Sequence, residues 1–142
     1  MQGKKERLCE VVLEQHLSVE NKHDINAIME TFAADAELIW GGKAYRGHEM
    51  IRKLHEGLGF GDQGAFSELS VVEIKRHTTT EAIIIEQKLT GRHTGTWEGI
   101  PATNKSVEVP ICTVYEFDES GHIISERPHL DRWILWKQLQ EC

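Results

Sequence analysis

Two side chains in the second half of the sequence, a histidine and an aspartate, are suited to moving protons. His93 has the same parity as several apolar residues of an extended segment, which places its imidazole on the apolar face if that strand has no bulge. Asp131 follows a later extended segment and, two residues apart from each neighbour, would share a strand face with Arg127 and His129. A carboxyl group at the wall of an apolar cavity is costly to ionise, so its pKa rises toward the range used in acid–base catalysis. We therefore predict Asp131 and His93 as candidate catalytic residues of one cavity.

Six further side chains are candidates for contacting a molecule bound in that cavity. They are Trp40, Trp97, Tyr115, Arg127, His129 and His16. Each candidate also has a structural alternative. The tryptophans suit a core or a dimer contact, and the arginine and histidines suit surface or structural positions. Asp131 suits the N-cap of a following helix, and His93 suits a hydrogen bond to a neighbouring strand.

Cofactor and metal motifs are weak in this sequence. The run Gly59–Gly64 has the letters of a dinucleotide-binding fingerprint, but it follows a helical segment and precedes an extended one, which is the reverse of the required order. His48 and His55, like His122 and His129, lie seven residues apart without companion ligands at metal-binding spacing. We therefore expect neither a metal ion nor a nucleotide cofactor.

The elements that would position these groups change type midway along the chain. The first half has helical periodicity and the second half alternates between apolar and polar residues. Helices are expected over Lys4–Asn21, after the N-cap Asp24, after Gly47 and over Leu130–Leu139, and strands over Glu37–Trp40, Glu68–Arg76, Glu81–Trp97, Ser106–Asp118 and His122–His129. This order predicts an α+β fold, in which N-terminal helices pack on one face of a cone-like, curved antiparallel sheet.

Composition and charge limit the classes of partner. With 142 residues, of which 39% are hydrophobic, the chain suits one domain over residues 1–142. The net charge of −7 repels phosphate backbones and anionic lipids, so we expect neither nucleic acid nor a membrane as a partner. Apolar runs are far shorter than the roughly 20 residues of a membrane span, and the three scattered cysteines suit reduced thiols, so a cytoplasmic location is expected.

Three features in order along the second half resemble the SnoaL-like polyketide cyclase family, which belongs to the nuclear-transport-factor-2-like superfamily. They are the segment Gly91–Lys105, the turn Gly121-His122-Ile123 and the later Asp131. The family carries a G-x-H-x-G-x-aromatic-x-G-I-P-x-T-x-K/R hairpin, a G-x-I turn and an Asp before a short C-terminal helix. Asn104 replaces the usual loop glycine, which is tolerable because asparagine accepts the left-handed region. Arg127 stands at a position where the family often has Trp, and Pro128 follows it. We expect this difference to alter the pocket wall.

The resemblance implies that Asp131 is the acid–base group of an intramolecular aldol ring closure on an aromatic polyketide ester, without metal or cofactor. We expect His93 then to stabilise or protonate the developing enolate oxygen. Three functional classes stay open: a cofactor-independent cyclase or isomerase acting on an apolar carbonyl compound, a non-catalytic ligand-binding or dimerisation module, and an epoxide hydrolase of the same fold. The hydrolase needs an Asp-Arg-Asp cluster, to which only Asp131 and Arg127 are readily assigned. A homodimer through the outer face of the sheet is expected, because helices cover only the other face.

Overall fold

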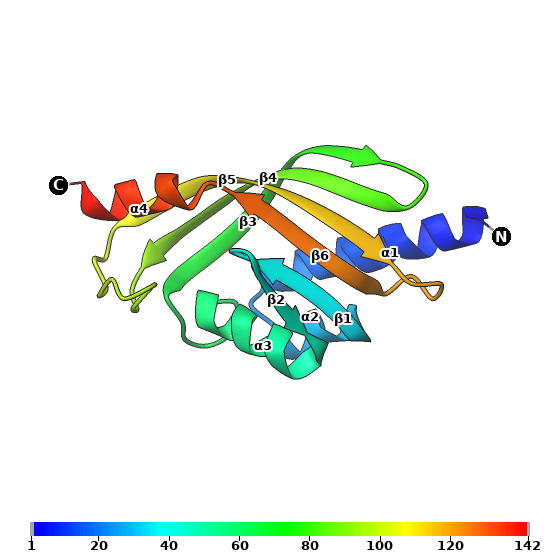
Figure 1. The fold of residues 1–142 in the computed structure, drawn as a ribbon, viewed down its shortest axis with the longest axis horizontal. Helices are drawn as coiled ribbons and strands as arrows, with labels where there is room; N and C mark the ends of the chain where they lie inside the picture. The colour runs from blue at the N-terminus through cyan, green and yellow to red at the C-terminus, as the bar shows by residue number, and fades with distance from the viewer. Residues whose placement is uncertain (1, 142) are drawn as a thin grey trace.

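The computed structural model describes residues 2–141 and arranges them as helices followed by a long-stranded sheet (Figure 1). The elements in chain order are α1 (Gln2–Asn21), α2 (Ile25–Glu30), β1 (Phe32–Trp40), β2 (Lys43–Arg46), α3 (Gly47–Leu58), β3 (Phe66–Thr78), β4 (Ala82–His93), β5 (Ser106–Phe117), β6 (Ile123–Leu130) and α4 (Arg132–Gln140). The predicted α+β class is confirmed.

All six strands form one curved sheet in the order β2-β1-β6-β5-β4-β3. The neighbours among β3 to β6 pair antiparallel, as predicted. In contrast, β1 pairs with β6 in parallel, so the prediction of a wholly antiparallel sheet is corrected. The segment Lys43–Arg46, which pairs with β1, was not predicted as a strand because it is short and has no apolar alternation. Strand β4 ends at His93 rather than at Trp97.

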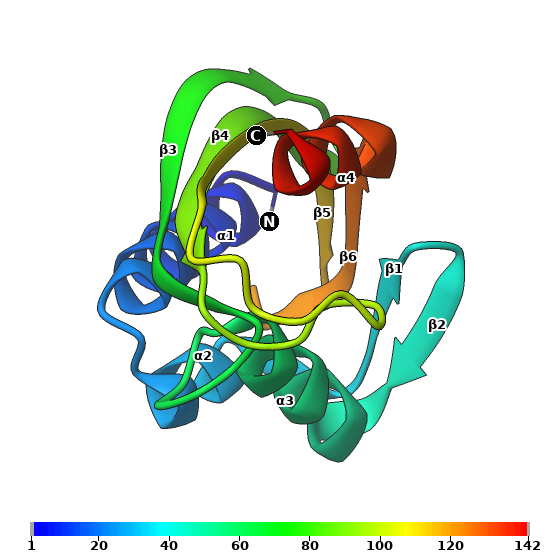
Figure 2. The ribbon, with the colours of Figure 1, turned by 90° about the vertical axis from the view of Figure 1, so that its left-hand side faces the viewer.

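The first three helices lie on the side toward which the sheet curves (Figures 1 and 2). Helix α1 contacts β3 and β6, and α3 contacts β1 and β2. Helix α4 contacts β5 at the other end of the molecule. Long strands that wrap around helices in this way leave an interior in which side chains from both layers meet.

Local sequence signals explain where the helices begin and end. Asp24 caps α2 by accepting a hydrogen bond from the Ala27 backbone N–H at 3.1 Å. Helix α3 ends at Gly59, whose φ is 125°, and a Cβ atom there would lie 1.9 Å from the carbonyl oxygen of Phe66. Only glycine fits this position. The glycine run that begins here is therefore a helix end and a loop, as its order in the sequence predicted.

Alternation along β5 builds the centre of the core. Every second side chain of this strand is buried against the helices, and the intervening ones face the other side: the buried set is Val107, Val109, Ile111, Thr113, Tyr115 and Phe117. The alternation predicted for the second half of the chain is confirmed in this strand. It carries a threonine and a tyrosine into an otherwise apolar interior.

Two smaller findings bear on the composition-based expectations. Within residues 2–141, no helix combines the length and the apolar character that crossing a membrane requires. Cys9 is buried and Cys112 is half-buried, and both are free thiols. Cys142, the third cysteine, lies outside the described residues.

Candidate functional site

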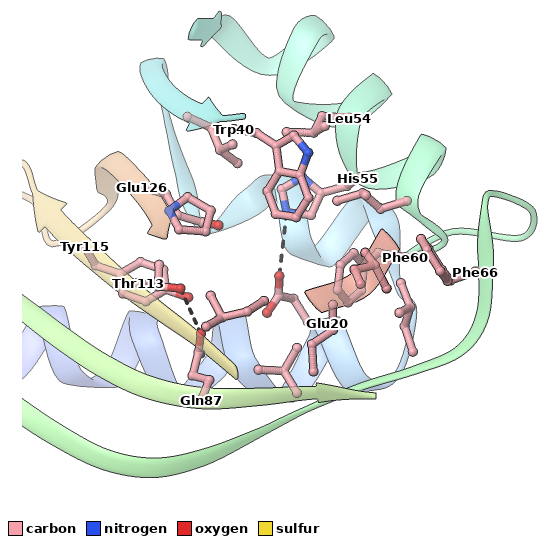
Figure 3. Close-up of a pocket in the computed structure, with 18 of the residues that line it drawn as sticks. Glu20, Trp40, Leu54, His55, Phe60, Phe66, Gln87, Thr113, Tyr115 and Glu126 are labelled. Atoms are coloured by element: carbon pink, nitrogen blue, oxygen red, sulfur yellow. Dashed lines mark hydrogen bonds and ion pairs between the residues drawn. The ribbon is translucent and has the colours of Figure 1, made fainter. Parts of the chain in front are cut away.

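An apolar cavity lies between the curved sheet and helix α3 (Figure 3). Its interior free volume is about 50 Å³, which exceeds the roughly 10–15 Å³ that one buried water needs. Most lining side chains are aliphatic or aromatic: Leu38, Trp40, Leu54, Leu58, Phe60, Phe66, Leu69, Val71, Leu89, Trp97, Ile111, Pro128 and Leu135. The polar lining residues are Glu20, His55, Gln87, Thr113, Tyr115 and Glu126.

Four buried ionisable side chains gather at one wall of this cavity. His16 and Glu20 are four residues apart on α1 and so share one face of that helix. His55 comes from α3 and Glu126 from β6. Glu20, His55 and Glu126 line the cavity, and none of the four residues is more than 6% exposed. Three segments far apart in the sequence therefore bring two imidazoles and two carboxylates together.

Hydrogen bonds fix the tautomers of both imidazoles. Nδ1 of His16 lies 2.9 Å from the hydroxyl oxygen of Thr31, and that hydroxyl donates its hydrogen to the Ile28 carbonyl at 2.6 Å. A hydroxyl has only one hydrogen, so Thr31 accepts from His16 and Nδ1 carries a proton. Nδ1 of His55 lies 2.9 Å from the Ile51 carbonyl oxygen, which can only accept, so it also carries a proton. Both rings thereby direct Nε2 toward the carboxylates.

The carboxylates raise the pKa values of both imidazoles, and the imidazoles lower the pKa of Glu20. His16 Nε2 lies 3.4 Å from both Glu20 Oε2 and Glu126 Oε1, and His55 Nε2 lies 3.7 Å from Glu20 Oε2. Burial opposes the charged imidazoles, but the carboxylates outweigh it, raising the pKa of His16 to about 10 and raising that of His55. Burial also opposes the Glu20 carboxylate, but His16 and His55 lower its pKa to about 2. Opposite charges thus stabilise one another inside the protein.

Hydrogen-bonding groups on the sheet complete this wall. Tyr115 pairs with Glu126 across the β5–β6 ladder, and both side chains line the cavity (Figure 3). Thr113 donates to Gln87 Oε1 at 2.8 Å. Burial, with the charges of Glu126 and Glu20, raises the pKa of Tyr115 well above its ordinary value, so the phenol keeps its proton and can donate it in a hydrogen bond. The wall therefore offers a bound molecule both a carboxylate and a hydrogen-bond donor.

Asp131 lies outside the cavity. Its side chain is exposed, and Oδ1 accepts a hydrogen bond from the Trp133 backbone N–H at 2.9 Å. The residue is the N-cap of α4, with extended backbone angles. The predicted position of Asp131 at the pocket wall is therefore wrong, and its contacts are those of the helix-capping alternative.

His93 is fully buried, but it does not line the cavity. Its Nδ1 accepts a hydrogen bond from the Thr103 backbone N–H at 3.2 Å and lies 3.0 Å from the Thr103 hydroxyl. The ring packs against Phe66 with 5.4 Å between the ring centroids. Burial lowers the pKa of His93, which favours the neutral ring. Among residues 2–141, no hydrogen bond joins His93 to Asp131, and His93 instead links the two ends of the β4–β5 connection.

The other sequence candidates divide into two groups. Trp40, Trp97 and Tyr115 line the cavity, and His16 lies directly behind its polar wall. Arg127 instead pairs with Glu116 at 2.5 Å, and His129 is exposed; neither lines the cavity.

A one-residue β-bulge explains why the residues of β6 that face the interior differ from those predicted. The register between β5 and β6 shifts at Ile124. Without this shift, Ser125 would stand opposite Tyr115; with it, Glu126 does. Arg127 and the later residues of its parity consequently turn away from the interior. The prediction grouped Arg127, His129 and Asp131 by parity, and the shift at Ile124 turns that parity outward.

Sequence reasoning missed the residues that make the polar wall: Glu20, His55, Gln87 and Glu126. Two signals were available. The spacing of His16 and Glu20 places two ionisable groups on one face of the first helix, and His55 lies on the apolar face of the third helix. Glu126 had no such signal, because only the bulge brings it inward.

Comparison with known proteins gives the family of the chain. Residues 10–139 match the SnoaL-like polyketide cyclase family. The chain belongs to this family. Among curated proteins, none matches this SnoaL-like sequence.

Solved structures share the fold of this SnoaL-like protein at low sequence identity. A SnoaL-like polyketide cyclase from Jannaschia sp. CCS1 has 18% identity and a TM-score of 0.84, with 96% of this chain and 94% of that chain covered. TsrD from Streptomyces laurentii has 17% identity and a TM-score of 0.79, with 94% and 95% covered. An LEH-like epoxide hydrolase from Mycobacterium tuberculosis has 18% identity and a TM-score of 0.72, with 94% and 90% covered. These likenesses confirm the nuclear-transport-factor-2-like fold.

The hairpin motif of this SnoaL-like protein, Gly91–Lys105, has a structural part in the site. The Asn104 backbone N–H donates to the His93 carbonyl at 2.7 Å, and Asn104 has a φ of 60°. Asparagine thus adopts the left-handed conformation that the sequence predicted for this glycine position. Trp97 extends from the same segment into the cavity lining. The motif therefore shapes the cavity wall and leaves the ionisable groups to α1, α3 and β6.

Proposed function

We propose that this SnoaL-like protein is an enzyme of the cyclase or isomerase type, which moves a proton on an apolar carbonyl compound with no cofactor taking part. One observation carries the proposal: the buried carboxylate of Glu126 stands beside the protonated phenol of Tyr115 on the wall of an apolar cavity. A base and a hydrogen-bond donor on one wall are the two groups that enolisation of a carbonyl compound requires.

The proton transfer begins at Glu126. Its carboxylate removes a proton from the carbon next to the substrate carbonyl, and the C–H electron pair moves to the carbonyl oxygen to give an enolate. The Tyr115 hydroxyl donates a hydrogen bond to that oxygen. In an isomerase, Glu126 returns the proton to a different carbon. In a cyclase, the enolate carbon attacks a second carbonyl of the same molecule, and the alkoxide formed takes the proton.

The surroundings of Glu126 favour this chemistry. His16 lies 3.4 Å from Glu126 Oε1 and does not line the cavity, so it can hold the carboxylate in position without occupying substrate space. The remaining lining is mainly apolar, which suits a neutral substrate and keeps water from the enolate. Trp40 and Trp97 provide flat surfaces for an unsaturated or aromatic body.

The two other functional classes have weaker support. An epoxide hydrolase with an Asp-Arg-Asp cluster would need an arginine at the cavity, and none is among the described lining residues. Arg127, the earlier candidate, points to Glu116 on the other face. A pure ligand-binding module would use the same cavity without proton transfer, so the experiment must separate binding from chemistry.

Deuterium exchange tests the proposal. The protein is incubated in deuterated water with a panel of apolar ketones and β-ketoesters, and incorporation next to the carbonyl is followed by mass spectrometry. We expect exchange with the wild type and a loss of roughly 10² to 10⁴ in rate with Glu126→Gln. Asp131→Asn is the matched carboxyl control and should exchange at the wild-type rate. Binding of the panel without exchange by the wild type would favour the binding module instead.

A further inference from the structure

We propose that His16, His55 and Glu126 form a binding site for one divalent transition-metal ion of the zinc class, with the Glu20 carboxylate beside the two histidines. The proposal goes beyond the acid–base function and does not depend on it. It also departs from the expectation of no metal site, which considered only histidines that are close in the sequence. Here the ligand types come from α1, α3 and β6.

The two imidazoles are already oriented as metal ligands. In metal sites, a ligating histidine donates its other ring N–H to a carbonyl, hydroxyl or carboxylate, which fixes the free nitrogen toward the ion. His16 does so through Thr31 and His55 through the Ile51 carbonyl. Both Nε2 atoms consequently point at the same small region between the carboxylates.

The distances between the histidine nitrogens and the carboxylate oxygens are close to those between neighbouring ligands of a tetrahedral ion. Zinc at about 2.0–2.2 Å from nitrogen and oxygen ligands places neighbouring ligand atoms about 3.3–3.5 Å apart. The observed separations from Nε2 to carboxylate oxygen are 3.4, 3.4 and 3.7 Å. Ligand atoms of His16, His55 and Glu126 all lie within 4.8 Å of one another. A charge-assisted N–H···O bond would be shorter, at about 2.7–2.9 Å.

Two ligand atoms of this cluster have charged neighbours but form no hydrogen bond with any of residues 2–141. His16 Nε2 and Glu126 Oε1 are fully buried, yet among residues 2–141 neither has a hydrogen-bond partner of acceptable geometry. Buried polar atoms without partners are costly and uncommon in native proteins. An ion between them would satisfy both atoms at once.

Charge and ligand type select the class of ion. Two carboxylates with two protonated imidazoles sum to zero, and so do two carboxylates with two neutral imidazoles and one divalent cation. The buried cluster therefore accepts the ion without acquiring net charge. Imidazole nitrogen favours zinc and its transition-metal neighbours over magnesium and calcium, which prefer oxygen alone.

A bound ion would hold the Glu126 carboxylate and prevent it from taking a proton. Ion binding and the proposed proton transfer therefore exclude each other at this wall. The substrate side of the cavity stays open, because His16 lies behind the wall and the aromatic lining is unaffected.

Zinc titration of the chelator-stripped protein tests the site without any substrate. Calorimetry at pH 8 should show one ion bound per chain and no comparable binding of magnesium or calcium. His55→Gln and Glu126→Gln should each weaken zinc binding more than tenfold. His48→Gln is the matched control, because His48 lies on the same helix but bonds the Phe32 carbonyl outside the cluster. Unchanged zinc affinity in His55→Gln and Glu126→Gln would overturn the proposal, as would no binding by the wild type.

X-ray absorption at the zinc edge decides the question on the wild type even if a variant does not fold. Two imidazole ligands with oxygen neighbours would support the site. A sulfur neighbour, which would indicate a cysteine ligand, or fewer than two imidazoles would refute it. Because no substrate is present, this result is independent of whether the deuterium-exchange experiment succeeds.

Discussion

Replacing Asp131 by alanine should destabilise the protein slightly and leave its chemistry unchanged. The substitution removes one exposed N-cap hydrogen bond, from Trp133 N–H to Oδ1 at 2.9 Å, and such a loss costs about 1 kcal/mol. Helix α4 keeps its place because Leu135 and Leu139 are buried, each only 3% exposed. For a chain of this size, about 1 kcal/mol corresponds to a fall of about 3 °C in melting temperature.

The matched variant Asp131→Asn should be almost silent, since asparagine caps a helix as well as aspartate does. Urea unfolding and calorimetry of both variants measure the difference. Deuterium exchange, measured in parallel, should proceed at the wild-type rate in each. The assignment of Asp131 as a cap would be refuted if Asp131→Asn abolished exchange while remaining as stable as the wild type. Equal destabilisation by both substitutions would also contradict it.

Three further predictions concern residues that support the site, and a fourth concerns assembly. Thr31→Val leaves His16 Nδ1 without its acceptor and should cost about 1–3 kcal/mol in urea unfolding, whereas Thr31→Ser should cost much less. Gly59→Ala should cost about 1–3 kcal/mol of stability, because φ is 125° and the Phe66 carbonyl oxygen occupies the place of a Cβ atom. Gly61→Ala is the control and should be near neutral, because no backbone atom blocks a Cβ atom there. In the metal-free protein, the His16 pKa of about 10 exceeds its unfolded value of about 6.5. Protonated His16 therefore contributes its full stabilisation of the folded state below about pH 6.5. As the pH rises toward 10, the free energy of unfolding should fall by at most about 1.4 kcal/mol per pH unit, and His16→Gln should reduce this slope. Finally, the exposed apolar side chains of β3 should support a homodimer, which sedimentation equilibrium showing only a 16.2 kDa species would contradict.

The fold followed from the sequence where the signals were local. Asp24 as a cap and the alternation of β5 were both predictable, because one depends on a side chain next to its own helix and the other on the two-residue period of a strand. The parallel pairing of β1 with β6 was not predictable in this way. It joins segments from opposite ends of the chain, and no turn residue marks such a contact.

The site was harder to predict, because its residues meet only after folding. Tyr115 and the two lining tryptophans were identified from residue type and parity. Glu126 was missed because the bulge at Ile124 adds one residue and reverses the inward face of β6. Asp131 was favoured by its position in the family motif, although that position also fits a cap. Parity arguments thus hold only as far as the register is regular.

A crystal structure of the protein with a bound apolar ketone would show whether Glu126 and Tyr115 are the groups that move the proton. We predict the ligand inside the cavity, its carbonyl oxygen within hydrogen-bond distance of the Tyr115 hydroxyl and the adjacent carbon facing the Glu126 carboxylate. A ligand that instead lies against Asp131 at the start of α4, with the cavity beside Glu126 left free, would contradict it.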